Sequence, residues 1–291
     1  KFMKTTLKIG LLALTASAFA LAACGGDKTA KTETKPAAKT MAKEMSALEV
    51  AATSETRGDN IARNDSRHPV KTLEFFGLEP GMDVVEIWPG GGWYSSILAP
   101  YATATDGSYT AALFPETSDY AKQGNARFRE NYPTAKTVTF GNDVAFQNAD
   151  ETPIQADMIV TFRNTHSWMR GGYADKAFKD FYGALKPGGT LGLVQHRLPA
   201  TAEQDPRAGT GYVQEDYVIM LAKEAGFELV GKSDVNANPK DTADHPFGVW
   251  TLPPVNRRAK RGEEPAADFD GSPFEAIGES DRMTLKFRKP E

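Results

Sequence analysis

The sequence predicts an α/β fold: a doubly wound, mostly parallel sheet of seven strands with an N-terminal helix before it. Short apolar runs, which are typical of buried parallel strands, alternate with longer amphipathic segments. Turns rich in glycine and proline separate these segments. The first strand runs directly into a glycine turn that opens a helix, which is how a doubly wound sheet begins.

Hydrophobic periodicity and turn residues give the order of elements. The N-terminal helix is expected over 45–62, with Leu48, Val50, Ala51 and Ile61 as its buried stripe. A short helix follows over 70–76 and ends at Gly77. Strands are expected at 83–88, 109–114, 135–140, 157–162, 190–196, 227–235 and 283–288, the last as an edge strand. Further helices are expected at 93–99, 120–131, 174–185 and 212–225, and a long loop at 253–280.

The composition excludes some classes of protein. The formal net charge is −4, from 34 basic and 38 acidic residues, so no electrostatic footprint for nucleic acid exists. Apolar residues make up 40% of the chain, which is normal for a globular protein. A single cysteine excludes an internal disulfide framework.

The beginning of the chain has the pattern of an export signal. Lys1, Lys4 and Lys8 precede an apolar run over 9–22, which is shorter than a membrane-spanning helix requires. The run ends in Leu21-Ala22-Ala23-Cys24-Gly25, which resembles the lipobox of bacterial lipoproteins. The alternative is a plain signal peptide with an incidental cysteine.

This resemblance implies a lipid on Cys24 and a periplasm-facing lipoprotein, and the lack of an aspartate after Cys24 favours the outer membrane over the inner membrane. The expected parts are a signal peptide over 1–24, a flexible tether over 25–45 and an α/β domain over 46–291. The tether is rich in Lys, Thr, Ala and Pro, so it buries too little apolar surface to fold.

Three motifs carry a resemblance to a known family. They are Glu86-Ile87-Trp88-Pro89-Gly90-Gly91-Gly92 after the first strand, Leu185-Lys186-Pro187-Gly188-Gly189 before the fifth, and Ala225-Gly226-Phe227 before the sixth. Their order and spacing resemble those of class I S-adenosylmethionine-dependent methyltransferases, which have a Rossmann-like fold, over residues 65–250 and the last strand. More narrowly, Val85 to Tyr94 together with Thr161-Phe162-Arg163-Asn164 is similar to a group of exported "predicted methyltransferases".

The resemblance implies roles for the glycine turn. Glu86 would lie near the methionine amino group of S-adenosylmethionine, and the turn of Trp88, Pro89, Gly90, Gly91 and Gly92 would approach the cofactor. The sequence departs from the family at two places. Trp88 replaces the first glycine, and its indole would fill cofactor space unless it points away. The second strand lacks the usual ribose-binding acid, for which Glu116 is the only nearby candidate.

Polar residues follow the later strands and are expected to meet at one rim of the sheet. Arg163, Asn164 and His166 follow the fourth strand, and His196 with Arg197 ends the fifth. A histidine accepts protons near neutral pH, so His166 is the first candidate for a catalytic base and His196 the second. The alternative is that both bond to backbone groups. The arginines would pair with a substrate carboxylate or phosphate, or else with acids of the protein.

A metal site is possible only if the four histidines, His68, His166, His196 and His245, lie close together in the fold. No close histidine spacing supports that reading, so no metal ligand is predicted.

These observations leave three functions open. The first is methyl transfer from S-adenosylmethionine to an unknown small acceptor, with alignment of donor and acceptor as the main source of rate. The second is a non-catalytic lipoprotein that binds another small ligand in a methyltransferase-like pocket. The third is a different chemistry of the histidine and arginine rim. The resemblance favours the first function, for which an exported location is a difficulty because S-adenosylmethionine is made in the cytoplasm. Trp88 and the missing ribose-binding acid favour the second.

Overall fold

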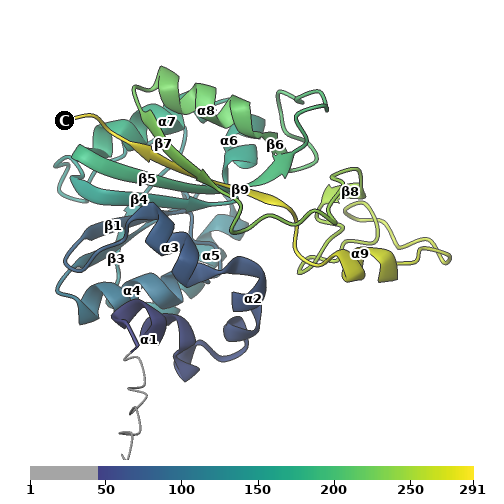
Figure 1. Ribbon diagram of the computed structural model, residues 1–291, viewed down its shortest axis with the longest axis horizontal. Coiled ribbons are helices and arrows are strands. Elements are labelled where there is room, and N and C mark those ends of the chain that lie inside the picture. The colour runs from purple at the N-terminus through teal and green to yellow at the C-terminus, as the bar shows by residue number, and fades with distance from the viewer. Residues whose placement is uncertain (1–44) are drawn as a thin grey trace, which may run out of the picture. The chain divides into compact units, whose positions relative to one another are not determined.

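A computed structural model of the protein describes residues 45–291 (Figure 1). The predicted signal peptide, Cys24 and nearly all of the tether lie outside the described residues. The strands are β1 (Asp83–Ile87), β2 (Ser108–Leu113), β3 (Lys136–Thr139), β4 (Ala156–Phe162), β5 (Leu185–Leu198), β6 (Val213–Gln214), β7 (Glu228–Ser233), β8 (Pro246–Val249) and β9 (Arg282–Arg288). The helices are α1 (Ala47–Thr53), the 3-10 helix η1 (Glu55–Arg63), α2 (Asn64–Arg67), α3 (Pro69–Phe76), α4 (Ser95–Ala104), α5 (Asp119–Asn131), α6 (Thr165–Gly171), α7 (Ala174–Ala184), α8 (Glu215–Glu224) and α9 (Ser272–Ile277).

The main sheet has the strand order β3-β2-β1-β4-β5-β9-β7, with β6 paired to the end of β5. The pairs from β3 to β5 are parallel, whereas β9 is antiparallel to both of its neighbours. The order reverses at β1 and β4, which is the point where doubly wound sheets bind ligands. The predicted fold class, a doubly wound and mostly parallel sheet of seven strands, is therefore confirmed.

Two helical layers cover the sheet because its strands are apolar on both faces. In β4, Met158 and Val160 pack into the core under α1, α3 and α4, whereas Ile159 packs into the core under α7 and α8. Within residues 45–291, no helix is long and apolar enough to cross a membrane.

The structure corrects the expected ends of the domain. The helix expected over 45–62 is broken at Ser54, and Gly58 inside η1 adopts φ +51°. Of the predicted buried stripe, Val50 in α1 is exposed and Ile61 in η1 is only partly buried. The last strand is not an edge strand, because β9 inserts between β5 and β7. The chain after β4 turns at once into α6, and α9 interrupts the loop expected over 253–280.

Gly192 shows how tightly α3 packs on the sheet. A Cβ atom at Gly192 in β5 would lie 2.4 Å from Cδ2 of Phe76, whose side chain is fully buried. We expect Gly192→Ala to lower the free energy of unfolding by about 1–3 kcal/mol through overpacking. Urea unfolding of the full chain would measure this loss.

Gly183→Ala is the matched control. A Cβ atom at Gly183 in α7 would meet nothing within 4 Å, so we expect this variant to be no less stable than the parent. Equal stability of the two variants would contradict the packing described for Phe76.

Candidate functional site

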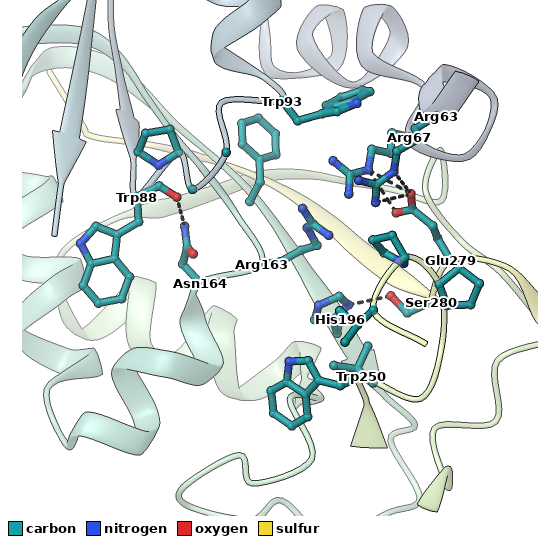
Figure 2. Close-up of a pocket in the computed structure, with 18 of the residues that line it drawn as sticks. Arg63, Arg67, Trp88, Trp93, Arg163, Asn164, His196, Trp250, Glu279 and Ser280 are labelled. Carbon is teal, nitrogen blue, oxygen red and sulfur yellow. Dashed lines mark hydrogen bonds and ion pairs between the residues drawn. The ribbon is translucent and has the colours of Figure 1, made fainter. Parts of the chain in front are cut away.

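A cavity of about 400 Å³ lies beyond the carboxyl ends of β1, β4 and β5, and we call it the inner pocket (Figure 2). It is bounded by the glycine turn, by the chain after β4, by η1 and α2, and by the segments that flank β8 and β9. Its lining residues are Asn60, Arg63, Arg67, Trp88, Pro89, Gly90, Gly91, Trp93, Phe162, Arg163, Asn164, His166, His196, Val249, Trp250, Pro253, Pro254, Val255, Glu279 and Ser280. The four predicted catalytic residues, Arg163, Asn164, His166 and His196, therefore lie together.

The ends of β1 and β4 are strained and tied to one another. Trp88 and Arg163 follow these strands with φ values of +48° and +65°, which side chains other than glycine rarely adopt. The amide of Asn164 donates hydrogen bonds to the carbonyl oxygens of Ile87 at 2.8 Å and Trp88 at 3.4 Å. Strain of this kind concentrates at functional sites, and here it directs Arg163 into the inner pocket.

Four guanidinium groups surround one carboxylate at the far wall of the inner pocket. Glu279 accepts hydrogen bonds from Nε of Arg63 at 2.8 Å and from Nε of Arg67 at 3.1 Å. Arg282 lies behind it, with Nη1 at 3.3 Å from the same carboxylate. Arg163 is the fourth cation, and Figure 2 shows its guanidinium directed towards this group. The cluster therefore has a formal excess of three positive charges.

Some of this positive charge has no partner. Among the described residues, the side chain of Arg163 makes no ion pair or hydrogen bond, and the buried Nη2 atom of Arg67 has no hydrogen-bond partner. Burial lowers the pKa of Arg67 to about 9 and that of Arg163 to about 10, so both stay charged at neutral pH. Burial alone would raise the pKa of Glu279, but the surrounding arginines outweigh it and bring the pKa to about 2.

The two histidines of the inner pocket are neutral at pH 7. Burial, assisted by the charge of Arg170, lowers the pKa of His166 to about 4, and burial lowers the pKa of His196 well below its usual value. Nδ1 of His166 lies 3.3 Å from the amide nitrogen of Gln195, and Nδ1 of His196 lies 2.6 Å from the hydroxyl of Ser280. Both are therefore poor proton acceptors near neutral pH, which is a difficulty for a catalytic base.

The Trp88 indole points away from the arginines (Figure 2). It donates a hydrogen bond to the carbonyl oxygen of Phe140 at 3.0 Å and lies 4.5 Å from the ring of Phe114 and 6.1 Å from that of Trp168, centroid to centroid. These residues stand at the ends of β2 and β3 and on α6. The indole thus occupies part of the space beyond β2 and β3 and leaves the inner pocket open beyond β4 and β5.

Glu86 does not reach the inner pocket. Its carboxylate accepts hydrogen bonds at 2.7 Å from the hydroxyl groups of Ser95 and Tyr109, and its side chain is buried under α4. Burial raises its pKa to about 7, against the lowering effect of these two hydrogen bonds. A carboxyl group enclosed in this way is not available to a ligand amino group.

The other predicted cofactor residues lie partly in the inner pocket and partly outside it. Pro89, Gly90 and Gly91 line the inner pocket, whereas Gly92 is covered by Tyr132, whose hydroxyl donates to its carbonyl oxygen at 2.8 Å. Glu116 lies on the surface, paired with Arg129 at 2.8 Å. A second hollow of about 290 Å³ lies between the glycine turn, the end of β2 and α5, and its lining holds no carboxylate.

These placements test the cofactor that the resemblance implies. S-adenosylmethionine would need an acid for its amino group and one for its ribose, and neither Glu86 nor Glu116 lines a hollow beside the glycine turn. Among the described residues that line the inner pocket, Glu279 is the one acid, and it is shared by three arginines. The residues present do not fit the usual mode of binding this cofactor.

The remaining predicted polar residues have structural partners. Arg197 pairs with Asp281 at 2.8 Å and with Asp234 at 3.1 Å, outside the inner pocket. His245 lies 2.7 Å from Asp241. Within residues 45–291, no group of three or more His, Cys, Asp or Glu side chains could hold a metal ion.

Of the five charged residues in this cluster, the sequence predicts only Arg163 as a site residue. Arg63 and Arg67 precede the first strand, Arg282 directly precedes the last predicted strand, and Glu279 falls in the expected loop, so no motif marks them as site residues. The spacing of Arg63 and Arg67, one helical turn apart, was the one available signal.

Comparisons with known proteins find distant similarity to solved structures alone. No protein-family model matches the chain, and no curated protein matches it. An S-adenosylmethionine-dependent methyltransferase from Aquifex aeolicus is 14% identical, with 82% of this chain and 98% of that chain covered and a TM-score of 0.47. The N-methyltransferase NodS from Bradyrhizobium japonicum WM9, in complex with S-adenosyl-l-homocysteine, is 15% identical, with 84% and 97% covered and a TM-score of 0.46. At these identities the likeness concerns the fold alone.

Glu86 makes stability depend on pH. Below pH 4.5 the Glu86 carboxyl is protonated in both the folded and the unfolded protein. Above pH 4.5 this carboxyl ionises in the unfolded protein, whereas in the folded protein it stays protonated until about pH 7. Folding is therefore disfavoured progressively as the pH rises from 4.5 to 7. Between pH 4.5 and 7, we expect the free energy of unfolding of Glu86→Gln to rise by about 3 kcal/mol relative to that of the parent protein.

Urea unfolding of both proteins at several pH values from 4.5 to 8 would measure the gain. The exposed Glu74→Gln is the control and should show no such trend. A difference between parent and Glu86→Gln that does not change with pH would contradict the buried carboxyl described above.

Proposed function

We propose that the chain binds a small molecule bearing an oxyanion, a carboxylate or a phosphate, in the inner pocket. The observation that carries the proposal is the excess of positive charge there: Arg63, Arg67 and Arg282 share Glu279, and Arg163 faces the cavity without an ion pair among the described residues. Buried cations without partners are costly, and an anion that pairs with them removes that cost. Arginine also offers two parallel donors to an oxyanion.

The other lining residues suit a small organic ligand. Trp93 and Trp250 supply apolar surface, while Asn164 and the neutral His166 supply polar contacts that carry no charge. A cavity of about 400 Å³ lies within the range of small-molecule sites. Charge recognition by arginines and a shaped apolar wall together favour a compact organic acid or phosphate ester.

Methyl transfer is the competing function, and the fold is compatible with it. The enclosed Glu86, the paired Glu116 and the Trp88 indole do not supply the contacts that the resemblance implies for S-adenosylmethionine. The proposed export of the chain adds to this argument, because the cofactor is made in the cytoplasm. The site therefore favours a binding function, with any catalysis acting on the bound anion.

Calorimetry on the full chain in mild detergent would test the proposed function. We expect inorganic phosphate or acetate to bind, and Arg163→Gln to weaken the better of the two at least tenfold, since a hydrogen bond to a charged group is worth about 1.5–3 kcal/mol. Arg288→Gln, at a surface ion pair with Glu228, is the matched control and should bind like the parent.

Two outcomes would overturn the proposal. One is that neither anion binds, or that either binds equally well to Arg163→Gln. The other is that S-adenosylmethionine binds at micromolar concentration and Glu86→Ala abolishes that binding, which would establish the cofactor mode of the methyltransferases.

We also propose that a lipid on Cys24 anchors the chain to a bacterial membrane facing the periplasm, the outer membrane being favoured. The support is the sequence alone: a basic start, an apolar run and a lipobox-like ending at the single cysteine. Metabolic labelling with an alkyne fatty acid in a bacterial host should label the chain, and Cys24→Ser should abolish the label. An unlabelled parent, or a labelled variant, would contradict the anchor.

A further inference from the structure

A second cavity, of about 490 Å³, opens next to the inner pocket, and we call it the outer basin. The two share His166 and Trp250, so they meet at these side chains. The outer basin is lined by Tyr120, His166, Ser167, Arg170, Gly209, Trp250, Arg257 and Arg261. Only one edge, formed by His166 and Trp250, therefore separates it from the proposed anion site.

The outer basin is positively charged, and no acid lies among its described lining residues. It holds three arginines and no acid, and among the described residues Arg170, Arg257 and Arg261 make no ion pair. The nearby acid Asp205 instead accepts hydrogen bonds from the backbone N–H groups of Arg207 at 2.9 Å and Gly209 at 2.6 Å.

Two of these arginines are held in place. The guanidinium carbons of Arg170 and Arg257 lie over the Trp250 ring, 5.3 and 5.0 Å from its centroid. Stacking on an aromatic face restricts a guanidinium group while its N–H donors remain available. Burial, together with the charges of Arg261 and Arg170, lowers the pKa of Arg257, as expected where no anion balances the group.

We propose that the natural ligand carries two oxyanion groups, of which Arg163 binds one in the inner pocket and Arg170 with Arg257 binds the other in the outer basin. The part of the ligand between the two groups passes Trp250 and His166, the residues common to both cavities. This inference rests on the proposed function, because it assigns the first oxyanion to the inner pocket. It defines the ligand class as a bis-phosphate, a dicarboxylate or a mixed phosphate and carboxylate.

The test compares ligands that differ only in the second charge. Calorimetry on the full chain would use alkanediol bisphosphates of two to eight carbons against alkyl monophosphates of the same length, with dicarboxylates and monocarboxylates as a parallel arm. We expect at least a tenfold lower Kd for the bis-anion at the best chain length, because the second group binds at high effective concentration. The arm with the larger gain identifies phosphate or carboxylate as the second group.

Variants of the outer basin separate its role from that of the inner pocket. Arg170→Gln with Arg257→Gln should remove the gain of the bis-anion and weaken its binding far more than that of the mono-anion, whereas Arg163→Gln should weaken both. Arg257→Lys, which keeps the charge but not the planar group, should retain part of the gain. Arg288→Gln is again the control.

The outcomes are distinguishable. If mono-anions bind through Arg163 but bis-anions bind no better at any length, or if the double variant weakens both alike, the two-anion ligand is excluded and the proposed function stands. If no anion binds, both proposals fail.

Discussion

The shared carboxylate of Glu279 is the interaction on which the site depends. It lies just before β9, and its partners Arg63 and Arg67 precede it by 216 and 212 residues. One buried acid therefore joins η1 and α2 to the sheet and closes the inner pocket on that side. Four guanidinium groups around a single carboxylate do not favour stability, because unpaired buried charge costs several kcal/mol. An anionic ligand bound beside these groups would offset the cost of their unpaired charge.

The sheet could be predicted from the sequence because its determinants are local. Strands such as β1 and β4 are apolar runs of strand length, and glycine and proline turns bound them. The failures occurred where tertiary contacts decide. Nothing local shows that β9 pairs with β5 and β7 instead of lying at an edge, and the break at Ser54 depends on how η1 packs.

The candidate site was half predictable for a related reason. Arg163, Asn164, His166 and His196 follow strand ends, and the topology of a doubly wound sheet brings strand ends together. Arg63, Arg67 and Glu279 come from elements outside that rule, so only the three-dimensional structure brings them to the same wall. The sequence also does not predict the enclosure of Glu86, because its hydrogen-bond partners Ser95 and Tyr109 come from a helix and a neighbouring strand.

The position of the Trp88 indole determines which space beyond the strand ends is open to a ligand. The indole lies over β2 and β3, where it has aromatic neighbours, Phe114 and Trp168, and a carbonyl acceptor at Phe140. The ring therefore occupies part of the space beyond β2 and β3, where a hollow of about 290 Å³ remains beside α5, and the space beyond β4 and β5 stays open to Arg163. Because function resides in sites and not in folds, the inner pocket left open by this placement of the indole is the part of the structure from which we infer what the chain binds.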